Sequence, residues 1–182
     1  MAKSQLEENY KIHIRPALQK ELSKKNLMEV PQISKIVLNV GAKDAVNDSR
    51  ILDKIMAVVE RIASQRPIKR AARKSIAGFK LREGMLIGVM VTLRDYAMYE
   101  FLYKLIHLAL PNMKDFQGIS VQFDGRGNYN LGIKDWTIFP EIRSSADELS
   151  YGCNITIHTT AETDKEGFAL LKKLGMPFKE QL

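Results

Sequence analysis

The alternation of apolar and polar residues predicts three β-strands, each with two chemically different faces. The pattern covers residues 35–40, 87–94 and 154–160, and successive side chains of a strand point to opposite sides of the sheet. The apolar positions are Ile36, Leu38, Val40, Ile87, Val89, Val91, Leu93, Ile155 and Ile157. The intervening positions carry mainly amides, hydroxyls and cations. The sequence therefore predicts a sheet with one face in the core and one open, polar face.

Helical periodicity predicts the elements that cover the core face. Residues 50–64 carry an apolar stripe at helical spacing, after Asp48 or Ser49 as the capping residue. The stripe consists of Ile51, Ile55, Val58, Val59 and Ile62. Further helices are expected over residues 5–25, 95–110 and 164–175. Pro16 can bend the first of them, because proline lacks the amide hydrogen that a helix interior needs.

Helices and strands are mixed, and some neighbouring strands have only short connections, which favours an α+β fold over a doubly wound parallel sheet. A short strand is expected near residues 68–72, and the segments 120–124 and 129–133 could pair as a hairpin. The chain of 182 residues shows no repeat or linker. We therefore expect one α+β domain over residues 1–182. Its mostly antiparallel sheet would have helices packed on one face and an open, polar second face.

The positive charge is concentrated in one segment. The chain carries 28 Lys and Arg residues against 21 Asp and Glu residues, a net charge of +7. Residues 61–84 contain eight basic residues and a single acid, Glu83. The net charge of this window therefore equals the net charge of the whole chain. Such a stretch is typical of proteins that bind polyanions, and nucleic acid is the commonest such partner. A membrane surface fits less well, because no amphipathic helical stripe accompanies the charge.

The predicted polar face adds neutral hydrogen-bonding groups to this charge. Asn39, Thr92 and Arg94 fall on it, and acidic residues are few there. Amides and hydroxyls suit the ribose hydroxyls, phosphates and base edges of structured RNA. Aromatic residues are sparse on the three strands, which favours recognition of RNA shape and backbone over base stacking. A solvated sheet face is the alternative.

Catalytic and metal sites have little support in the sequence. His13, His107 and His158 lack a partner at the spacing of a known motif. The single cysteine, Cys153, rules out an intrachain disulfide and a thiolate-rich zinc site. We expect no catalytic residue, metal, cofactor or small-molecule substrate. His158 lies on the polar strand face and is a weaker binding candidate.

Neither a membrane span nor a secretion signal is expected. The longest apolar run, residues 85–93, is about nine residues long, whereas a membrane-spanning helix needs about 20. The first ten residues lack the apolar core of a signal peptide. A cytoplasmic protein without a membrane partner is therefore expected.

A glycine-rich segment, FDGRGNYNLG at residues 123–132, has two possible interpretations. It lacks the third glycine of a dinucleotide-binding loop and the GK[ST] ending of a phosphate-binding loop. Asp124-Gly125 is a typical tight-turn pair, so a structural turn is favoured. The alternative is a nucleotide-dependent or RNA-processing enzyme that uses this turn.

Five runs of residues, taken in order, carry a family resemblance. They are VPQISKIVLNVG (30–41), SQRPIKRAARKSIAGFKLREGMLIGVMVTLR (64–94), YEFLYKLIHLALPNMKDFQGIS (99–120), FDGRGNYNLGI (123–133) and IFPEI (138–142). In order and spacing they resemble the bacterial large-subunit ribosomal protein family that binds 5S rRNA, the universal family numbered five. The resemblance extends from about residue 10 to Lys179.

The resemblance implies binding to 5S rRNA through the open strand face and its margins. The residues expected at that contact are Lys35, Asn39, Gln65, Arg66, Thr92 and Arg94. It also implies that a basic loop projects at about residues 73–84 and approaches P-site tRNA at its elbow. The residues expected at the tRNA are Arg73, Lys74, Ser75, Gly78, Phe79, Lys80 and Arg82.

Further partners follow from the same resemblance. They are 23S rRNA, neighbouring large-subunit proteins and a head protein of the small subunit, reached through an intersubunit bridge. The bridge is expected at Lys114, Asp115, Arg143 and Asp147. A non-catalytic, ribosome-bound protein of the cytoplasm is thus expected. A DNA-binding regulator is a further alternative, although no helix-turn-helix pattern or dimer heptad is present.

Overall fold

The computed structural model describes residues 4–46, 48–114, 116–142 and 150–179. The chain divides into two compact units. Unit 1 comprises Met1–Ile36, Arg94–Leu131 and Thr156–Leu182, and unit 2 comprises Val37–Leu93 and Gly132–Ile155. The expectation that residues 1–182 form a single domain stays a prediction.

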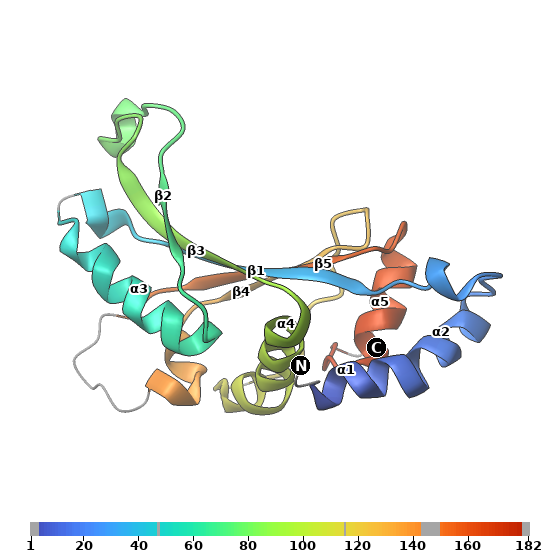
Figure 1. Ribbon diagram of the computed structural model, residues 1–182. Coiled ribbons are helices and arrows are strands. Elements are labelled where there is room, and N and C mark those ends of the chain that lie inside the picture. The colour runs from blue at the N-terminus through green and yellow to red at the C-terminus, as the bar shows by residue number, and fades with distance from the viewer. Residues whose placement is uncertain (1–3, 47, 115, 143–149, 180–182) are drawn as a thin grey trace. The chain divides into compact units, whose positions relative to one another are not determined.

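Five strands form an antiparallel sheet in the order β2-β3-β1-β5-β4. They are β1 (Ile33–Gly41), β2 (Ile68–Ala71), β3 (Leu86–Leu93), β4 (Tyr129–Ile133) and β5 (Cys153–Thr159). The alternation predicted for the strands is present: Leu38 and Val40 are buried, whereas Asn39 between them is half-buried. The sheet and its accompanying helices (Figure 1) confirm the α+β class.

In unit 2, helix α3 (Arg50–Ala63) packs against β3. Its buried residues are Leu52, Ile55, Val58, Val59, Ile62 and Ala63. Ile51, which was expected in this stripe, is half-buried and Leu52 takes the core position. The carboxylate of Asp48 accepts a hydrogen bond from the Arg50 amide at 2.9 Å, whereas the Ser49 side chain makes no capping bond. Ser64 ends the helix in the left-handed conformation, with φ 53°.

In unit 1, the N-terminal helix accommodates Pro16 through a π-helical segment. Helix α1 (Gln5–Asn9) continues through Tyr10–Ile14 in π geometry into α2 (Arg15–Glu21). The amide of Arg15 bonds to the carbonyl of Tyr10, five residues back. This wider turn just before Pro16 accommodates a residue that cannot donate an α-helical hydrogen bond. The hydroxyl of Tyr10 then donates to the Pro31 carbonyl at 2.8 Å.

Two further helices complete unit 1. Helix α4 (Asp95–Lys104) runs on through a π-helical and a 3₁₀ segment to Asn112, so Pro111 lies inside the last turn rather than beyond it. Helix α5 (Asp164–Lys173) begins at Thr163, whose hydroxyl accepts from the Glu166 amide at 3.4 Å. The described helices include none long and apolar enough to cross a membrane.

The expected hairpin of residues 120–124 and 129–133 is only partly present. Residues Tyr129–Ile133 form β4, but the earlier segment contributes a single bridge, Phe123 to Tyr129. In place of a second ladder, Phe123 packs its ring 5.1 Å from that of Tyr129. Aromatic packing thus replaces the main-chain pairing that the turn pattern predicted.

Candidate nucleic-acid interface

The polar positions of β1 and β3 in unit 2 bring together two of the expected RNA contacts. Asn39 lies on β1 and Thr92 on the neighbouring β3, and both side chains are half-buried. The adjacent positions Val91 and Leu93 are buried, and β3 packs against α3, which lies along the strands in Figure 1. Asn39 and Thr92 therefore fall on the strand positions that do not enter the core.

Gln65 reaches the same strand from the end of α3. The left-handed conformation of Ser64 turns the chain out of the helix, and the Gln65 side-chain amide donates to the Thr92 carbonyl oxygen at 3.2 Å. One of its two N–H groups and its carbonyl oxygen remain for another partner. Arg66, the next residue, is exposed. The structure thus brings Gln65 to Thr92 across 27 positions of sequence.

The antiparallel strands β2 and β3 carry the basic window. Lys69 pairs with Val89 and Arg70 with Gly88 in the register, and a bulge follows between Arg70 and Ala71. A Cβ atom on Gly88 would lie 3.0 Å from the Val40 carbonyl oxygen, so a glycine lets β3 approach β1 closely here.

One cation of this window has a carboxylate partner that the sequence analysis overlooked. The Nζ atom of Lys69 lies 2.7 Å from Oδ1 of Asp53 on α3. Asp53 lies outside residues 61–84, so counting acids within the window could not find it. The charge of Lys69 is consequently balanced in part by Asp53.

The loop between β2 and β3 is exposed but hydrogen-bonded to itself. Ile76 and Leu81 exchange two main-chain hydrogen bonds of 3.0 and 3.1 Å, and the Ser75 hydroxyl accepts from the Glu83 amide at 2.9 Å. All seven residues expected at tRNA are exposed: Arg73, Lys74, Ser75, Gly78, Phe79, Lys80 and Arg82. Figure 1 shows the loop at the far end of the β2–β3 ribbon in unit 2. It therefore presents cations and one aromatic ring on a defined turn.

Phe79 is the exposed aromatic residue at this turn. Its exposed fraction is 66%, and Lys80 after it adopts the left-handed conformation with φ 55°. Exposing a phenyl ring to water is unfavourable, so an exposed ring between cations is typical of a contact surface.

The two remaining residues expected at 5S rRNA belong to unit 1. Lys35 is half-buried on β1, and Arg94 is exposed directly before α4. His158 of β5 is influenced by Lys35: partial burial lowers the pKa of the imidazole, and the Lys35 ammonium lowers it further. The polar strand positions of unit 1 therefore carry a cation beside an imidazole whose pKa is lowered.

The chain matches known proteins over nearly its whole length. Residues 26–82 match the ribosomal protein L5 family, and residues 86–178 match the C-terminal region of the same ribosomal family. The large ribosomal subunit protein uL5 of Acidobacterium capsulatum is 53% identical over 178 residues, which cover 97% of this chain and 98% of that protein. The chain belongs to the ribosomal protein L5 family.

Two other curated relatives have the same level of similarity to this L5-family chain. The uL5 protein of Desulforapulum autotrophicum is 54% identical over 175 residues, 96% of this chain and 98% of its own length. That of Mycoplasma mycoides is 51% identical over 179 residues, 98% and 99% of the two chains. Proteins of this family are structural and not enzymes, which confirms the expectation of a non-catalytic protein.

The glycine-rich segment of this L5-family chain is a structural turn. The carboxylate of Asp124 accepts hydrogen bonds from the Arg126 amide, the Asn128 amide and the Asn128 side chain at 2.7–3.0 Å. These bonds, first of all that from the Asn128 side chain, lower the pKa of Asp124. The carboxylate is thus used to shape the turn, and family membership excludes the enzyme interpretation.

The turn also docks onto α5 through two glycines. The Gly127 amide donates to the Asp164 carboxylate at 2.9 Å, and the Gly127 carbonyl accepts from the Thr159 hydroxyl at 2.8 Å. A Cβ atom on Gly167 would lie only 2.6 Å from the Gly127 carbonyl oxygen. Glycine is therefore required at 167 for the turn to approach the helix.

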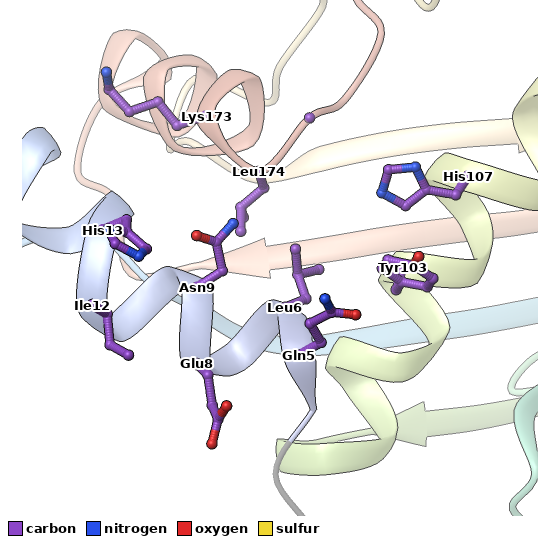
Figure 2. Close-up of a pocket in the computed structure, with 11 residues that line it drawn as sticks. Gln5, Leu6, Glu8, Asn9, Ile12, His13, Tyr103, His107, Lys173 and Leu174 are labelled. Carbon is purple, nitrogen blue, oxygen red and sulfur yellow. The ribbon is translucent and has the colours of Figure 1, made fainter.

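Unit 1 also contains a hollow lined by two histidines. Figure 2 shows His13 with Asn9 and Glu8 on the N-terminal helix, and His107 with Tyr103 on the helix that begins as α4. The rings of Tyr103 and His107 lie 4.4 Å apart. Within the described ranges, no group of three or more His, Cys, Asp or Glu side chains could hold a metal ion.

The residues expected at an intersubunit bridge are largely outside the described part of the chain. Lys114 is exposed after the long helix. Asp115, Arg143 and Asp147 lie outside the described residues.

Proposed function

We propose that this structural protein of the large ribosomal subunit binds 5S rRNA through the polar strand positions and presents its basic loop to P-site tRNA. Membership of the L5 family supports the ribosomal role, and with it rRNA binding in a ribonucleoprotein of the bacterial cytoplasm. The observation that carries the 5S proposal is the hydrogen bond from Gln65 to Thr92, beside Asn39 on the next strand.

The chemistry of these residues suits folded RNA. Asn39 and Gln65 offer amide donors and acceptors, and Thr92 offers a hydroxyl group. Such groups match ribose 2′-hydroxyls and phosphate oxygens, which identify RNA by its shape and backbone. Arg66 and Arg94, together with Lys35, would add phosphate contacts, which position an RNA without reading its sequence.

The basic loop suits a partner that binds reversibly. Its cations, Arg73, Lys74, Lys80 and Arg82, are exposed side chains on a short turn. Phosphate contacts of this kind give modest affinity that is blind to sequence and sensitive to salt. A tRNA that must leave after each cycle requires such a releasable contact, whereas the 5S contact can be permanent.

Contacts with 23S rRNA, with neighbouring large-subunit proteins and with a small-subunit head protein are part of the same proposal. The bridge to the small subunit would use Lys114, Asp115, Arg143 and Asp147. Support for these contacts comes from the family resemblance, and Lys114 is accessible for such a contact.

A salt titration of 5S rRNA binding tests the proposal. The logarithm of the binding constant should fall linearly with the logarithm of salt concentration, by very roughly 0.7 to 0.9 for each phosphate contacted. Duplex DNA of equal length is the competitor, and 5S rRNA should be preferred at every salt concentration. A slope near zero, or equal binding of the duplex DNA, would contradict 5S recognition.

A further inference from the structure

Unit 1 contains a hollow with a cationic rim and an apolar floor. It has a volume of about 710 Å³ and lies between the end of α2 and one face of α5, the two helices that Figure 1 draws side by side. The lining residues are Glu21, Leu22, Lys165, Phe168, Ala169, Lys172 and Lys173. None of them lies in the basic window of residues 61–84 or on the strands of the proposed 5S contact.

The α5 side of this hollow alternates cations with an aromatic ring. Lys165, Phe168 and Lys172 follow each other at i, i+3 and i+7, and therefore share one face of the helix. The opposite face is buried through Leu170 and Leu171. The Nζ atom of Lys172 lies 5.7 Å from the centre of the Phe168 ring. The ring also packs against the rings of Phe178 and Phe123, with 4.8 and 6.5 Å between ring centres. It is therefore half-buried, and only the part that lines the hollow remains accessible.

Ion pairs account for the other charges around the hollow. Lys173 pairs with Glu21 at the end of α2 at 2.9 Å, and Lys24, just after α2, pairs with Glu166 at 2.8 Å. Both pairs join α5 to this part of the chain. Lys165 and Lys172 have no carboxylate partner among the residues that the structure describes. Two unbalanced ammonium groups beside a ring would attract an anionic ligand with a flat, apolar part.

We infer that this hollow binds single-stranded RNA, with one base against the Phe168 ring and the neighbouring phosphates at Lys165 and Lys172. The two lysines are two helical turns apart, about 10 Å along the axis, so they suit two different phosphates of one strand better than a single phosphate. Stacking of a base on an aromatic ring and pairing of its backbone with cations are the two contacts that hold single strands. The inference rests on the proposed RNA-binding function and extends it to a separate surface.

A polypeptide partner fits the hollow less well. Its apolar floor is small, consisting of Leu22, Ala169 and Phe168, all half-buried. Burial of so little apolar surface would contribute little to a protein interface. The unbalanced lysines, in contrast, favour phosphate.

The test is a titration of the full ¹⁵N-labelled chain with an eight-nucleotide oligouridylate, followed by NMR. We expect the amide signals of residues 165–172 to shift and saturate. The variant Lys165→Gln with Lys172→Gln should weaken binding at these amides at least fivefold. Its salt slope should fall by about 1.4, because each lost phosphate contact removes about 0.7 for a single strand. Phe168→Leu, which keeps an apolar side chain but removes the ring, should weaken binding about fivefold or more.

The matched control is Lys20→Gln with Lys25→Gln. It removes the same charge from exposed positions of unit 1 that do not line the hollow, and it should change the affinity less than twofold. Equal weakening by both double variants, or shifts confined to residues 73–82, would overturn the inference.

Binding of 5S rRNA by the same proteins separates the two proposals. If the unmodified chain binds 5S rRNA while α5 does not respond to the oligouridylate, only the hollow is refuted. Failure of the unmodified chain to bind 5S rRNA refutes the proposed function.

Discussion

The side-chain amide of Gln65 donates a hydrogen bond to the main-chain carbonyl oxygen of Thr92 at 3.2 Å. The bond fixes a residue from the end of α3 against β3, on the strand next to Asn39. A side chain held in this way loses less rotamer freedom on binding RNA than a free one, which favours affinity. Gln65 is therefore in contact with Thr92, and Asn39 lies on the strand next to Thr92.

Replacement of Asn39 or Thr92 by alanine should weaken binding of 5S rRNA about five- to tenfold. Each change removes hydrogen-bonding groups that contribute about 1 kcal/mol. Because both side chains are only half-buried, the chain should stay folded. Filter binding measures the affinity and urea unfolding measures stability. Thr137→Ala, at an exposed position of unit 2, is the matched control and should bind 5S rRNA normally.

Removal of two loop charges, by Lys74→Ala with Lys80→Ala, should leave the affinity for 5S rRNA unchanged and alter the occupancy of P-site tRNA. The two side chains are exposed on the loop and are assigned to the releasable contact. Binding of 5S rRNA to the isolated protein and occupancy of P-site tRNA on reconstituted ribosomes would be measured. Lys20→Ala with Lys54→Ala removes the same charge from exposed helical positions and serves as the control. Loss of 5S binding in the loop variant, with normal 5S binding by the Asn39 and Thr92 variants, would reverse the assignment.

Gly167→Ala should lower the free energy of unfolding by about 1–3 kcal/mol, as expected for an overpacked contact. The added methyl group would meet the carbonyl oxygen and Cα of Gly127 at 2.6 and 3.0 Å. Both neighbours are main-chain atoms that cannot rotate away. Gly78→Ala, which would meet no atom within 4 Å, is the control for urea unfolding. Equal stability of the two variants would show that the turn can move away from α5.

Replacement of Lys35 by glutamine should raise the pKa of His158. Burial lowers this pKa first, and the Lys35 ammonium lowers it further, so removal of the ammonium reverses only the second effect. The imidazole signals would be followed by NMR between pH 4.5 and 8, with Lys11→Gln as a control that should leave the pKa unchanged.

The same shift predicts the direction of a stability change with pH. A folded-state pKa below the unfolded value of about 6.5 means that the unfolded chain binds the proton first as the pH falls. The His158 contribution to stability is therefore constant only well above pH 6.5, where the imidazole is neutral in both states, and it begins to change as the pH falls towards about 6.5. It becomes increasingly unfavourable below that pH, until the folded-state pKa is also passed.

Local patterns predicted much of the fold, because burial follows periodicity. Alternation identified β1, β3 and β5, and helical spacing identified α3 with four of its core residues correctly placed, Ile55, Val58, Val59 and Ile62. The π-helical segment at Tyr10–Ile14 was not predicted, although the buried residues Leu6, Tyr10, Ile14 and Leu18 recur at every fourth position, more widely than the 3.6 residues of an α-helical turn. The prediction of a hairpin before β4 was wrong in its extent, because the turn signal at Asp124-Gly125 does not specify how many residues pair.

Contacts between residues distant in sequence could not be predicted. The ion pair of Lys69 with Asp53 and the hydrogen bond of Gln65 to Thr92 depend on how α3 lies against the strands. The face of α5 that carries Lys165, Phe168 and Lys172 was also overlooked. Acidic and basic residues nearly balance within residues 164–175. The cationic face is recognised only when the structure shows which lysines form ion pairs with carboxylates and which do not.

The two main-chain hydrogen bonds between Ile76 and Leu81 have a kinetic consequence. A basic loop that is already ordered before a ligand binds does not have to search for its binding conformation at each encounter. Arrival and departure of successive ligands would then leave its backbone unchanged. Mutations that break these two hydrogen bonds should lower the association rate of a ligand more than they raise its dissociation rate, even when every cation of the loop is retained.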